Sequence, residues 1–231
     1  MAHKRKSNTT KLEIIQVASK MFLERGYSKT TIKAMADELD ISSGHLMFYF
    51  PSKEHLLAVL VDKLCDFQWK MMQSAVEEGK TSLMAICLEL AAMASMCEDD
   101  EIAKDFYLSA YSHPATLGII RRNDTERAKM VFAEYCPNWE DVFFVEAEIL
   151  VSGIEYATLM TTDDSVTLDV RIAGALNNIL TTYNVPEKTR RMKIDKVLAM
   201  DYHELGKHIL KEFKEYVEEA NEQAFEELLM K

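Results

Sequence analysis

A chain of 231 residues is long enough for one or two domains, each with a hydrophobic core of its own. With 48% hydrophobic and 28% charged residues, it has the composition of a folded protein and is too apolar to be disordered throughout. The formal net charge of −11 argues against a protein that coats nucleic acid with its whole surface.

Seven glycines and four prolines leave few helix breakers, and strand-like alternation is absent, so we predict an all-α fold. The first helix is expected from about Thr9 to Arg25, where Gly26 ends it. Its apolar face repeats at helical spacing and consists of Ile14, Val17, Ala18, Met21 and Phe22.

Residues 31–50, TIKAMADELDISSGHLMFYF, predict two short helices joined by a tight turn. The hydroxyl residues that can cap them are Thr30 or Thr31 for the first helix and Ser42 or Ser43 for the second. We expect the first helix to end near Asp40 and the second to run through Phe48, before Pro51 interrupts the chain.

A long helix is expected to begin at Lys53, and further helices follow Gly79. They are predicted at about 81–97, 99–111, 115–135, 139–161, 166–183 and 187–230, with a break in the last at Gly206. The most apolar stretch, residues 83–97, carries Glu89 at its middle and falls short of the roughly 20 residues of a membrane span. We therefore interpret it as a buried helix and expect no membrane association.

The cysteines at positions 65, 87, 97 and 136 form no C-x-x-C pair. The sequence therefore indicates neither a zinc site nor a dithiol redox site, and we expect no metal and no cofactor. No uninterrupted apolar run typical of an export signal follows the basic N-terminal residues, so we expect a cytoplasmic protein with reduced, partly buried thiols.

The charge is distributed unevenly along the chain. Residues 1–56 hold nine Lys or Arg and six Asp or Glu, a net charge of +3, whereas the remaining 175 residues hold 18 and 32, a net charge of −14. A basic head on an acidic body is typical of a small DNA-reading module attached to a second domain, because phosphate contact needs local cations.

The pattern over residues 31–57 is specific in both residue type and spacing. It consists of Thr31, Ala36, Ile41, Ser42, Gly44, Leu46, Tyr49, Phe50, Pro51, Ser52, Lys53, Leu56 and Leu57. These residues resemble the N-terminal signature of TetR/AcrR-type transcriptional regulators, a resemblance that covers roughly residues 10–58. It implies a helix-turn-helix DNA-binding domain, residues 1–52, followed by a larger helical ligand-binding and dimerisation domain, residues 53–231.

Carried over by position, the resemblance implies a set of DNA-binding residues: Thr31, Lys33, Ser42, Ser43, Gly44, His45, Phe48, Tyr49 and Lys53. Lys33 and His45 can exchange hydrogen bonds with base edges in the major groove, and Lys53 begins a helix whose N-terminus favours phosphate. Two positions depart from the family pattern. Met47 stands where a phosphate-contacting tyrosine is usual, and Asp40 stands where the turn usually has glycine. Phe50 is expected in the core.

Soft and aromatic side chains are concentrated between residues 67 and 111, as is typical of a pocket for a mostly apolar effector. The candidate ligand-binding residues are Trp69, Met72, Glu89, Met93, Met96, Phe106, Tyr107 and Tyr111. Most of them also suit a plain core. Glu89 is more specific, and its two interpretations are a pocket anion and the partner of a buried base.

In the family, the helices at about 139–161 and 166–183 correspond to the pair that packs against a second copy. Small and apolar residues there permit such packing, namely Ile149, Gly153, Ile154, Ala157, Ala173, Gly174, Ala175, Leu176 and Ile179. The tail after Pro186 has three interpretations: it covers the pocket, widens the dimer contact or binds another protein.

The resemblance implies a ligand-responsive, sequence-specific regulator of transcription, a homodimeric repressor that a mostly apolar small molecule releases from double-stranded operator DNA. The alternative is a helical ligand-binding or protein-interaction protein whose head lacks specific operator binding, which Met47 and the acidic net charge motivate. Motifs of phosphate-binding loops, zinc proteases and serine hydrolases are absent, so we do not expect an enzyme.

Overall fold

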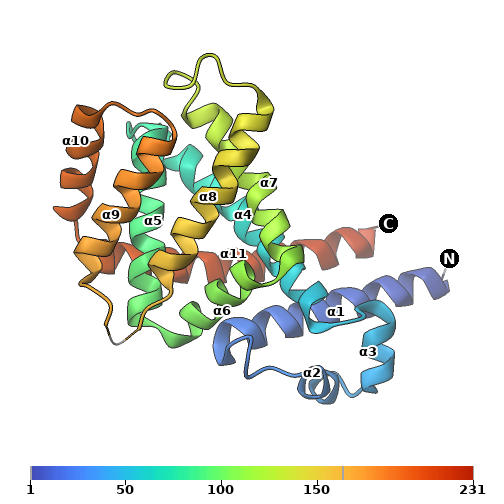
Figure 1. Cartoon of the computed structure of the whole chain (residues 1–231). Helices are drawn as coiled ribbons and strands as arrows, with labels where there is room; N and C mark the ends of the chain where they lie inside the picture. The colour runs from blue at the N-terminus through green and yellow to red at the C-terminus, as the bar shows by residue number, and fades with distance from the viewer. Residues whose placement is uncertain (1, 163, 231) are drawn as a thin grey trace.

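The computed structural model describes residues 2–162 and 164–230, with the side chains of residues 7–162 and 164–228. Eleven helices and no strand occur in this part of the chain, which confirms the all-α prediction (Figure 1). In chain order they are α1 (Ala2–Arg25), α2 (Ile32–Glu38), α3 (Ser43–Tyr49), α4 (Lys53–Glu77), α5 (Ser82–Asp99), α6 (Glu101–Ser112), α7 (Pro114–Val131), α8 (Asp141–Leu159), α9 (Leu168–Thr182), α10 (Glu187–Leu198) and α11 (Tyr202–Met230). Helices α1 to α3 are named the head below, and α4 to α11 the body.

The two short helices of the head begin at capped positions. Thr31 Oγ1 accepts a hydrogen bond from the backbone N–H of Ala34, and Ser42 Oγ accepts one from His45, both at 3.1 Å. Asp40, in the turn between the helices, has a φ of +52°, a left-handed conformation that its short polar side chain tolerates. The helices enclose a small core that includes Ile14, Phe22, Met35, Leu46 and Phe50, which confirms the interior place expected for Phe50.

Helix α5 is the centre of the body. It contacts α4, α6, α8, α9, α10 and α11, and all its residues from Leu90 to Cys97 are buried. The prediction of a buried helix is therefore confirmed.

No helix in the described residues combines the length and the apolar composition needed to cross a membrane. The four cysteines are buried and form no disulfide, and burial raises the pKa of each thiol.

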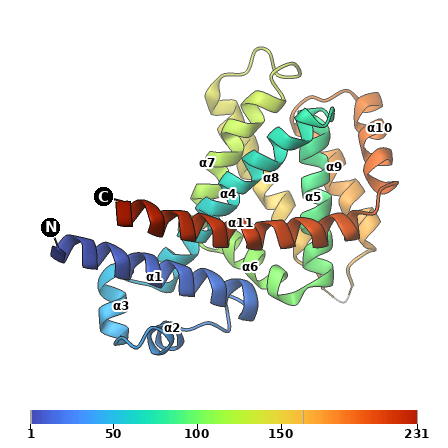
Figure 2. The same cartoon turned by 180° about the vertical axis from the view of Figure 1, so that it is seen from behind.

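Head and body are joined through α4, α6 and α11. Figure 2 shows α11 crossing the body and then lying beside α1, and the two helices are in contact. The turn after α1 is tied to α6, since Ser28 N donates to Asp105 Oδ2 at 2.8 Å. Lys63 of α4 donates a hydrogen bond to Asn221 of α11. Since both α4 and α11 contact α1, a movement of either helix acts on α1, against which α2 of the head packs.

The single helix predicted at 187–230 is wrong, and so is the break at Gly206. The chain breaks between Leu198 and Tyr202, where Asp201 Oδ1 accepts a hydrogen bond from Glu204 N at 3.0 Å. An acidic or hydroxyl residue followed three positions later by Glu is a known helix-start signal, which this sequence contains. Gly206 instead lies buried within α11, against α5. Several helix ends also differ from prediction, most of them by one or two residues. The larger differences are that α1 begins at residue 2 rather than about 9, and that α7 ends at 131 rather than 135.

We expect Gly206→Ala to destabilise the protein, although alanine favours an exposed helix by about 1 kcal/mol over glycine. A methyl group there would overlap Ser95 Oγ and lie 3.0 Å from the carbonyl oxygen of Ala92, so α11 would have to move away from α5. The expected loss in the free energy of unfolding is about 1 to 3 kcal/mol, measured by urea denaturation. The control is Gly118→Ala in α7, where the nearest atom, Arg122 Nη1, is 3.6 Å away. Equal stability of the two variants would contradict the prediction.

Candidate functional site

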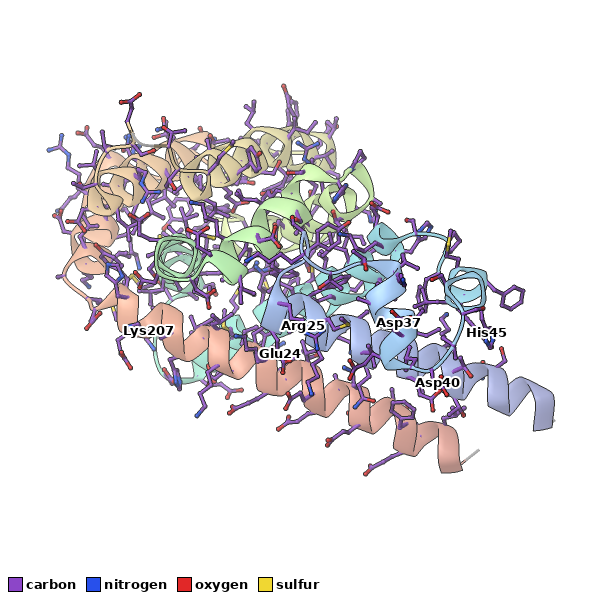
Figure 3. The ribbon with its side chains drawn as sticks, turned by 90° about the horizontal axis from the view of Figure 1, so that it is seen from below. Glu24, Arg25, Asp37, Asp40, His45 and Lys207 are labelled. Atoms are coloured by element: carbon purple, nitrogen blue, oxygen red, sulfur yellow. The ribbon has the colours of Figure 1, made fainter. Side chains whose placement is uncertain are left out.

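The outer side of α3 carries several residues that were expected to read DNA. Gly44, His45 and Phe48 are exposed, and the Phe48 side chain reaches 79% exposure. Figure 3 shows His45 on the side of the head that is turned away from the body. Its ring packs against Tyr49 with centroids 5.6 Å apart, which restricts the orientation of the imidazole. An exposed phenylalanine next to this histidine provides an apolar contact for a partner.

The remaining candidates of the head lie around this surface. Lys33 is exposed on α2, and Ser43 and Tyr49 are half-buried. The hydroxyl groups of Thr31 and Ser42 are engaged as helix caps, so they position the two short helices as well as facing solvent. Helices α2 and α3 are in contact, and the candidates on both are at least partly exposed to solvent.

Lys53 has partners within the chain. Its Nζ donates to the carbonyl oxygens of Tyr27 at 2.9 Å and Thr30 at 3.0 Å, and it lies 3.9 Å from the centre of the Tyr27 ring. Burial lowers the pKa of this ammonium group. The side chain therefore fastens the start of α4 to the turn after α1. The 25-residue helix α4 begins at Lys53, and the helix dipole favours an anion at this N-terminus.

The structure distributes the expected ligand residues between cavities and core. Met72 and Glu89 line a groove of about 620 Å³ between α4, α5 and α11, named the outer groove. Trp69 instead donates its Nε1 hydrogen to Asn123 Oδ1 at 2.7 Å, and the Phe106 ring packs against Phe213.

Of the three interpretations of the tail after Pro186, covering a pocket fits the structure, because α11 forms one wall of the outer groove.

A second space, named the inner cavity, has a volume of about 40 Å³ between α5, α7, α8 and α9. It is lined by Ile86, Glu89, Leu90, Met93, Asp124, Arg127, Ala128, Phe132, Glu148, Val151, Glu155, Leu176, Ile179, Leu180 and Tyr183. Among them, only Glu89 and Met93 were expected from the sequence to bind a ligand, whereas Leu176 and Ile179 were expected to pack against a second copy. Glu148 and Glu155 carried the same signal as Glu89, a carboxylate within an apolar helix, and their seven-residue spacing places them on one face.

Glu89 is the partner of a buried base. Arg127 of α7 donates to both of its carboxylate oxygens, with Nη1 3.0 Å from Oε1, and also reaches Asp124 Oδ1 at 3.2 Å. Gln68 of α4 adds a hydrogen bond of 2.7 Å to Glu89 Oε1. The interpretation of Glu89 as the partner of a buried base is therefore confirmed. Glu89 also lines the inner cavity.

The carboxyl groups of the inner cavity outnumber its basic groups. Four carboxyl groups, on Glu89, Asp124, Glu148 and Glu155, line the cavity together with one guanidinium group, that of Arg127. Burial raises the pKa of Asp124 to about 6 and that of Glu148 to about 8, and it raises the pKa of Glu155 well above the ordinary range. The site therefore holds protons that solvent-exposed carboxyl groups would have lost at neutral pH.

Glu148 is incompletely satisfied. It is 3% exposed, and its Oε1 accepts a hydrogen bond from the Tyr183 hydroxyl group. Its Oε2 is buried without a hydrogen-bond partner. Glu155, seven residues along α8, accepts a hydrogen bond of 2.9 Å from the hydroxyl group of Tyr111. An unpartnered carboxylate oxygen that lines a cavity is a binding position for a hydrogen-bond donor or a cation.

The surface of α8 and α9 is apolar on the side away from this cavity. Figure 1 shows the two helices side by side on the near face of the body, and the contacts between them agree. The large apolar side chains that are at least half exposed there are Val142, Val145, Ile149, Leu150 and Val170. The sequence assigned Ala175, Leu176 and Ile179 to such a surface, which is wrong: all three are buried in the core of the chain.

No group of three or more side chains suited to hold a metal ion occurs in the described residues. The chemistry of this molecule therefore centres on two regions: the exposed outer side of α3 and the acid-rich interior of the body.

Comparison with known proteins finds similarity that is concentrated in the head. Residues 14–60 match the family model of bacterial regulatory proteins, tetR family. An uncharacterized HTH-type transcriptional regulator, YuxN of Bacillus subtilis (strain 168), is 42% identical over 80 residues, 35% of this chain and 28% of that protein. The HTH-type transcriptional repressor KstR2 of Mycobacterium tuberculosis (strain CDC 1551 / Oshkosh) is 33% identical over 76 residues, 33% of this chain and 38% of that protein.

A further relative, the HTH-type transcriptional regulator HbdR of Aromatoleum sp. (strain CIB), is 27% identical over 110 residues, 48% of this chain and 47% of that protein. The chain thus spans less than half the length of each of these three relatives. Among solved structures, a gamma-butyrolactone receptor (ArpA-like protein) aligns with a TM-score of 0.44 at 17% identity, over 92% of this chain and 100% of that chain.

We expect Glu148→Gln to change how stability depends on pH. The glutamate ionises above about pH 4.5 in the unfolded chain, but in the folded protein burial raises its pKa to about 8. Between these values the folded state binds more protons than the unfolded state, so the free energy of unfolding falls as pH rises. Glutamine does not ionise, so its variant does not lose this stability as pH rises. Urea denaturation should show the variant more stable than the parent by about 1 to 3 kcal/mol at pH 8.5, and similar at pH 5.

The matched control is Glu140→Gln, which removes an exposed carboxylate that makes no capping hydrogen bond at the start of the same helix. It should leave the pH dependence of the parent unchanged. Parallel stability curves for Glu148→Gln and the parent from pH 5 to 8.5 would show that Glu148 does not hold its proton in the folded state.

Proposed function

Residues 14–60 match the family model of bacterial regulatory proteins, tetR family, and from this match we propose that the protein is a homodimeric, sequence-specific repressor of transcription whose body binds a small-molecule effector. In this proposal residues 1–52 are the DNA-binding domain and residues 53–231 the ligand-binding and dimerisation domain. The observation that carries it is the family match over residues 14–60, which includes both short helices with their exposed outer side.

In the proposed complex, α3 enters the major groove of operator DNA. Lys33 can donate to guanine acceptors, His45 can donate or accept at a base edge, and Phe48 can contact the methyl group of thymine. Ser43 and Gly44 let the backbone of α3 approach the bases, while Thr31, Ser42 and Tyr49 face phosphates. At Lys53 we assign the phosphate contact to the N-terminus of α4 rather than to the ammonium group, because that group holds two carbonyl oxygens.

We infer that the apolar outer surface of α8 and α9 is the dimer interface. Ile149, Leu150 and Val170 are at least half exposed and lie on two adjacent helices. Large apolar side chains exposed together in this way indicate a surface that a partner covers. The exposed small residues Gly153 and Gly174 allow close approach of a second copy. A two-fold axis through this surface would pair α8 and α9 with the same helices of the partner.

An effector acts on DNA binding only if it binds one spacing of the two heads better than another. Two recognition helices need a separation of about 34 to 36 Å to enter successive major grooves. Helix α4 runs from the head to the wall of the outer groove, so a change at that wall tilts the helix that carries the head. We propose that effector binding moves α4 in this way and releases the operator.

We expect the double variant Lys33→Ala/His45→Ala to lose specific operator binding by about 100-fold or more, because each base contact contributes about 1 to 3 kcal/mol. Both side chains are exposed, so the fold should be retained. The operator is first obtained by selecting bound sequences from a random duplex pool, and affinity is then measured by gel shift at two salt concentrations.

The control for this experiment is Lys207→Ala, which removes an exposed lysine of α11 far from the head (Figure 3). Unchanged operator affinity of the double variant would overturn the assignment of α3. Binding by the parent that depends on salt but selects no sequence would favour the alternative, a helical ligand-binding or interaction protein whose head does not read an operator.

We expect Leu150→Glu to convert the dimer into a monomer at micromolar concentration, because the change places a carboxylate of each copy in the apolar interface. The Leu150 side chain is 60% exposed in the single chain, so the substitution should not unfold it. Sedimentation velocity measures the mass, and operator affinity should fall by about 100-fold or more with the loss of the second head. Met192→Glu on α10, at a residue that is 46% exposed, is the control and should stay dimeric. A dimeric Leu150→Glu variant would place the interface elsewhere.

A further inference from the structure

We propose that the body binds an organic cation, an amine whose ammonium group enters the inner cavity beside Glu148 and whose apolar part extends past Glu89 toward the outer groove. This inference rests on the proposed function and deepens it, since it names the chemical class of the effector. It is carried by the charges of the cavity, by the unpartnered oxygen of Glu148 and by the way three spaces meet at Glu89.

The charges of the inner cavity favour a cation. With all groups ionised, the four carboxylates and one guanidinium of the lining would leave three uncompensated negative charges in a poorly solvated space. Arg127 donates its Nη hydrogens to Glu89 and Asp124, while its Nε is buried without a partner. The charge of the nearby Arg121 acts to lower the pKa of Glu148, and its Nε donates a hydrogen bond to Ser152 Oγ. An added ammonium group would supply the missing positive charge.

Glu148 provides the specific contact. Its Oε1 is held by the Tyr183 hydroxyl group, which orients the carboxyl group, while Oε2 stays buried and without a partner. An ammonium group has three donors and no acceptor, so it can bond this oxygen and a second carboxylate such as Glu155 at once. A carboxylate ligand would instead add a fifth acid to the site, and an alcohol would bring no charge.

The apolar part of the ligand also has a defined place. Glu89 lines the inner cavity, the outer groove and a small space of about 10 Å³ between them. Met93 is shared by the inner cavity and the small space, and Met71 by the small space and the outer groove. Unbranched methionine side chains change rotamer easily, so this passage can widen for an alkyl chain.

The size of the inner cavity limits what enters it in this conformation. About 40 Å³ holds a few water-sized groups, which suits an ammonium head but not a ring or a chain. The outer groove, with about 620 Å³, has room for the remainder of the ligand. Five glutamates line it, at positions 78, 89, 212, 215 and 219, against Lys70, Lys80 and His208, so the entrance also attracts a cation.

Binding of a cation should release protons. The groups that face Glu148 are Asp124, Arg121 and Arg127 of α7, Glu155 of α8, Glu89 of α5 and Tyr183 of α9. Burial raises the pKa of Glu148 to about 8, so this carboxyl group is mostly protonated at pH 7. A cation beside it favours the ionised form, and the proton is transferred to the buffer. A neutral ligand in the same space has no such effect.

The test uses three probes of equal length on the full chain: octylamine, which is protonated at pH 7, 1-octanol and octanoate. Isothermal titration calorimetry in two buffers of different ionisation enthalpy measures both affinity and proton release. We expect octylamine to bind at least tenfold more tightly than 1-octanol, with net proton release, and octanoate not to bind. Equal or tighter binding of 1-octanol or octanoate, or no binding of octylamine at millimolar concentration, would overturn the proposal.

Two variants locate the site. Glu148→Gln should weaken octylamine binding at least tenfold and abolish most of the proton release, while leaving the affinity for 1-octanol unchanged. Glu140→Gln makes the same substitution at an exposed residue directly before the same helix and should bind like the parent. The melting temperature of each variant at pH 7 shows whether it is folded. If a folded Glu148→Gln variant binds octylamine as the parent does, Glu148 is not the contact and the proposal fails.

The binding test needs no DNA, so it is independent of the proposed repressor function. Octylamine binding that leaves operator affinity unchanged would retain the cation site and remove its role as an effector site. Selective operator binding together with failure of all three probes would retain the DNA-binding function and overturn the cation site. The two proposals can therefore fail separately.

Discussion

The buried ion pair between Glu89 and Arg127 is the interaction on which the interior of the body depends. It joins the central helix α5 to α7, and the hydrogen bond from Gln68 extends it to α4. Loss of one partner of such a pair leaves an uncompensated buried charge, at a cost of about 3 to 5 kcal/mol. Because Glu89 lines both the inner cavity and the outer groove, the pair holds α5 against α7 at the point where these two spaces approach each other.

The arrangement of charge follows from the two regions of the chain. The first 56 residues carry a net charge of +3 and the remaining 175 a net charge of −14, so an anionic partner is attracted to the head and repelled by the body. Helices α4 and α11 both wall the outer groove and both contact α1. A ligand that changes the packing of this wall therefore acts directly on the helix that supports α2 and α3. This short path is a physical basis for coupling between body and head.

Much of the head could be predicted from single residues. Gly26 ends α1 with a φ of +92°, and Phe50 is buried, both as the sequence indicated. Thr31 and Ser42 cap the next two helices, each being one of the two hydroxyl residues that the sequence offered. The helical break near residue 200 was missed, although Asp201 and Glu204 carried a start signal, because glycine was taken as the breaker. Gly206 has a different role, since its missing side chain lets α11 approach α5.

The sequence alone determined most of the helices, the caps of the two short ones, the buried nature of α5 and the family resemblance of the head, because these features depend on residues within a few turns of one another. It did not determine which apolar face of α9 turns inward, so Leu176 and Ile179 were assigned to the outside although both are buried. It also did not assemble the inner cavity. The carboxyl groups of that cavity come from α5, α7 and α8, and the hydroxyl group that orients Glu148 comes from α9. Only tertiary packing brings these groups together. Burial raises their pKa values and leaves Glu148 Oε2 without a partner, and burial is a property of the assembled helices.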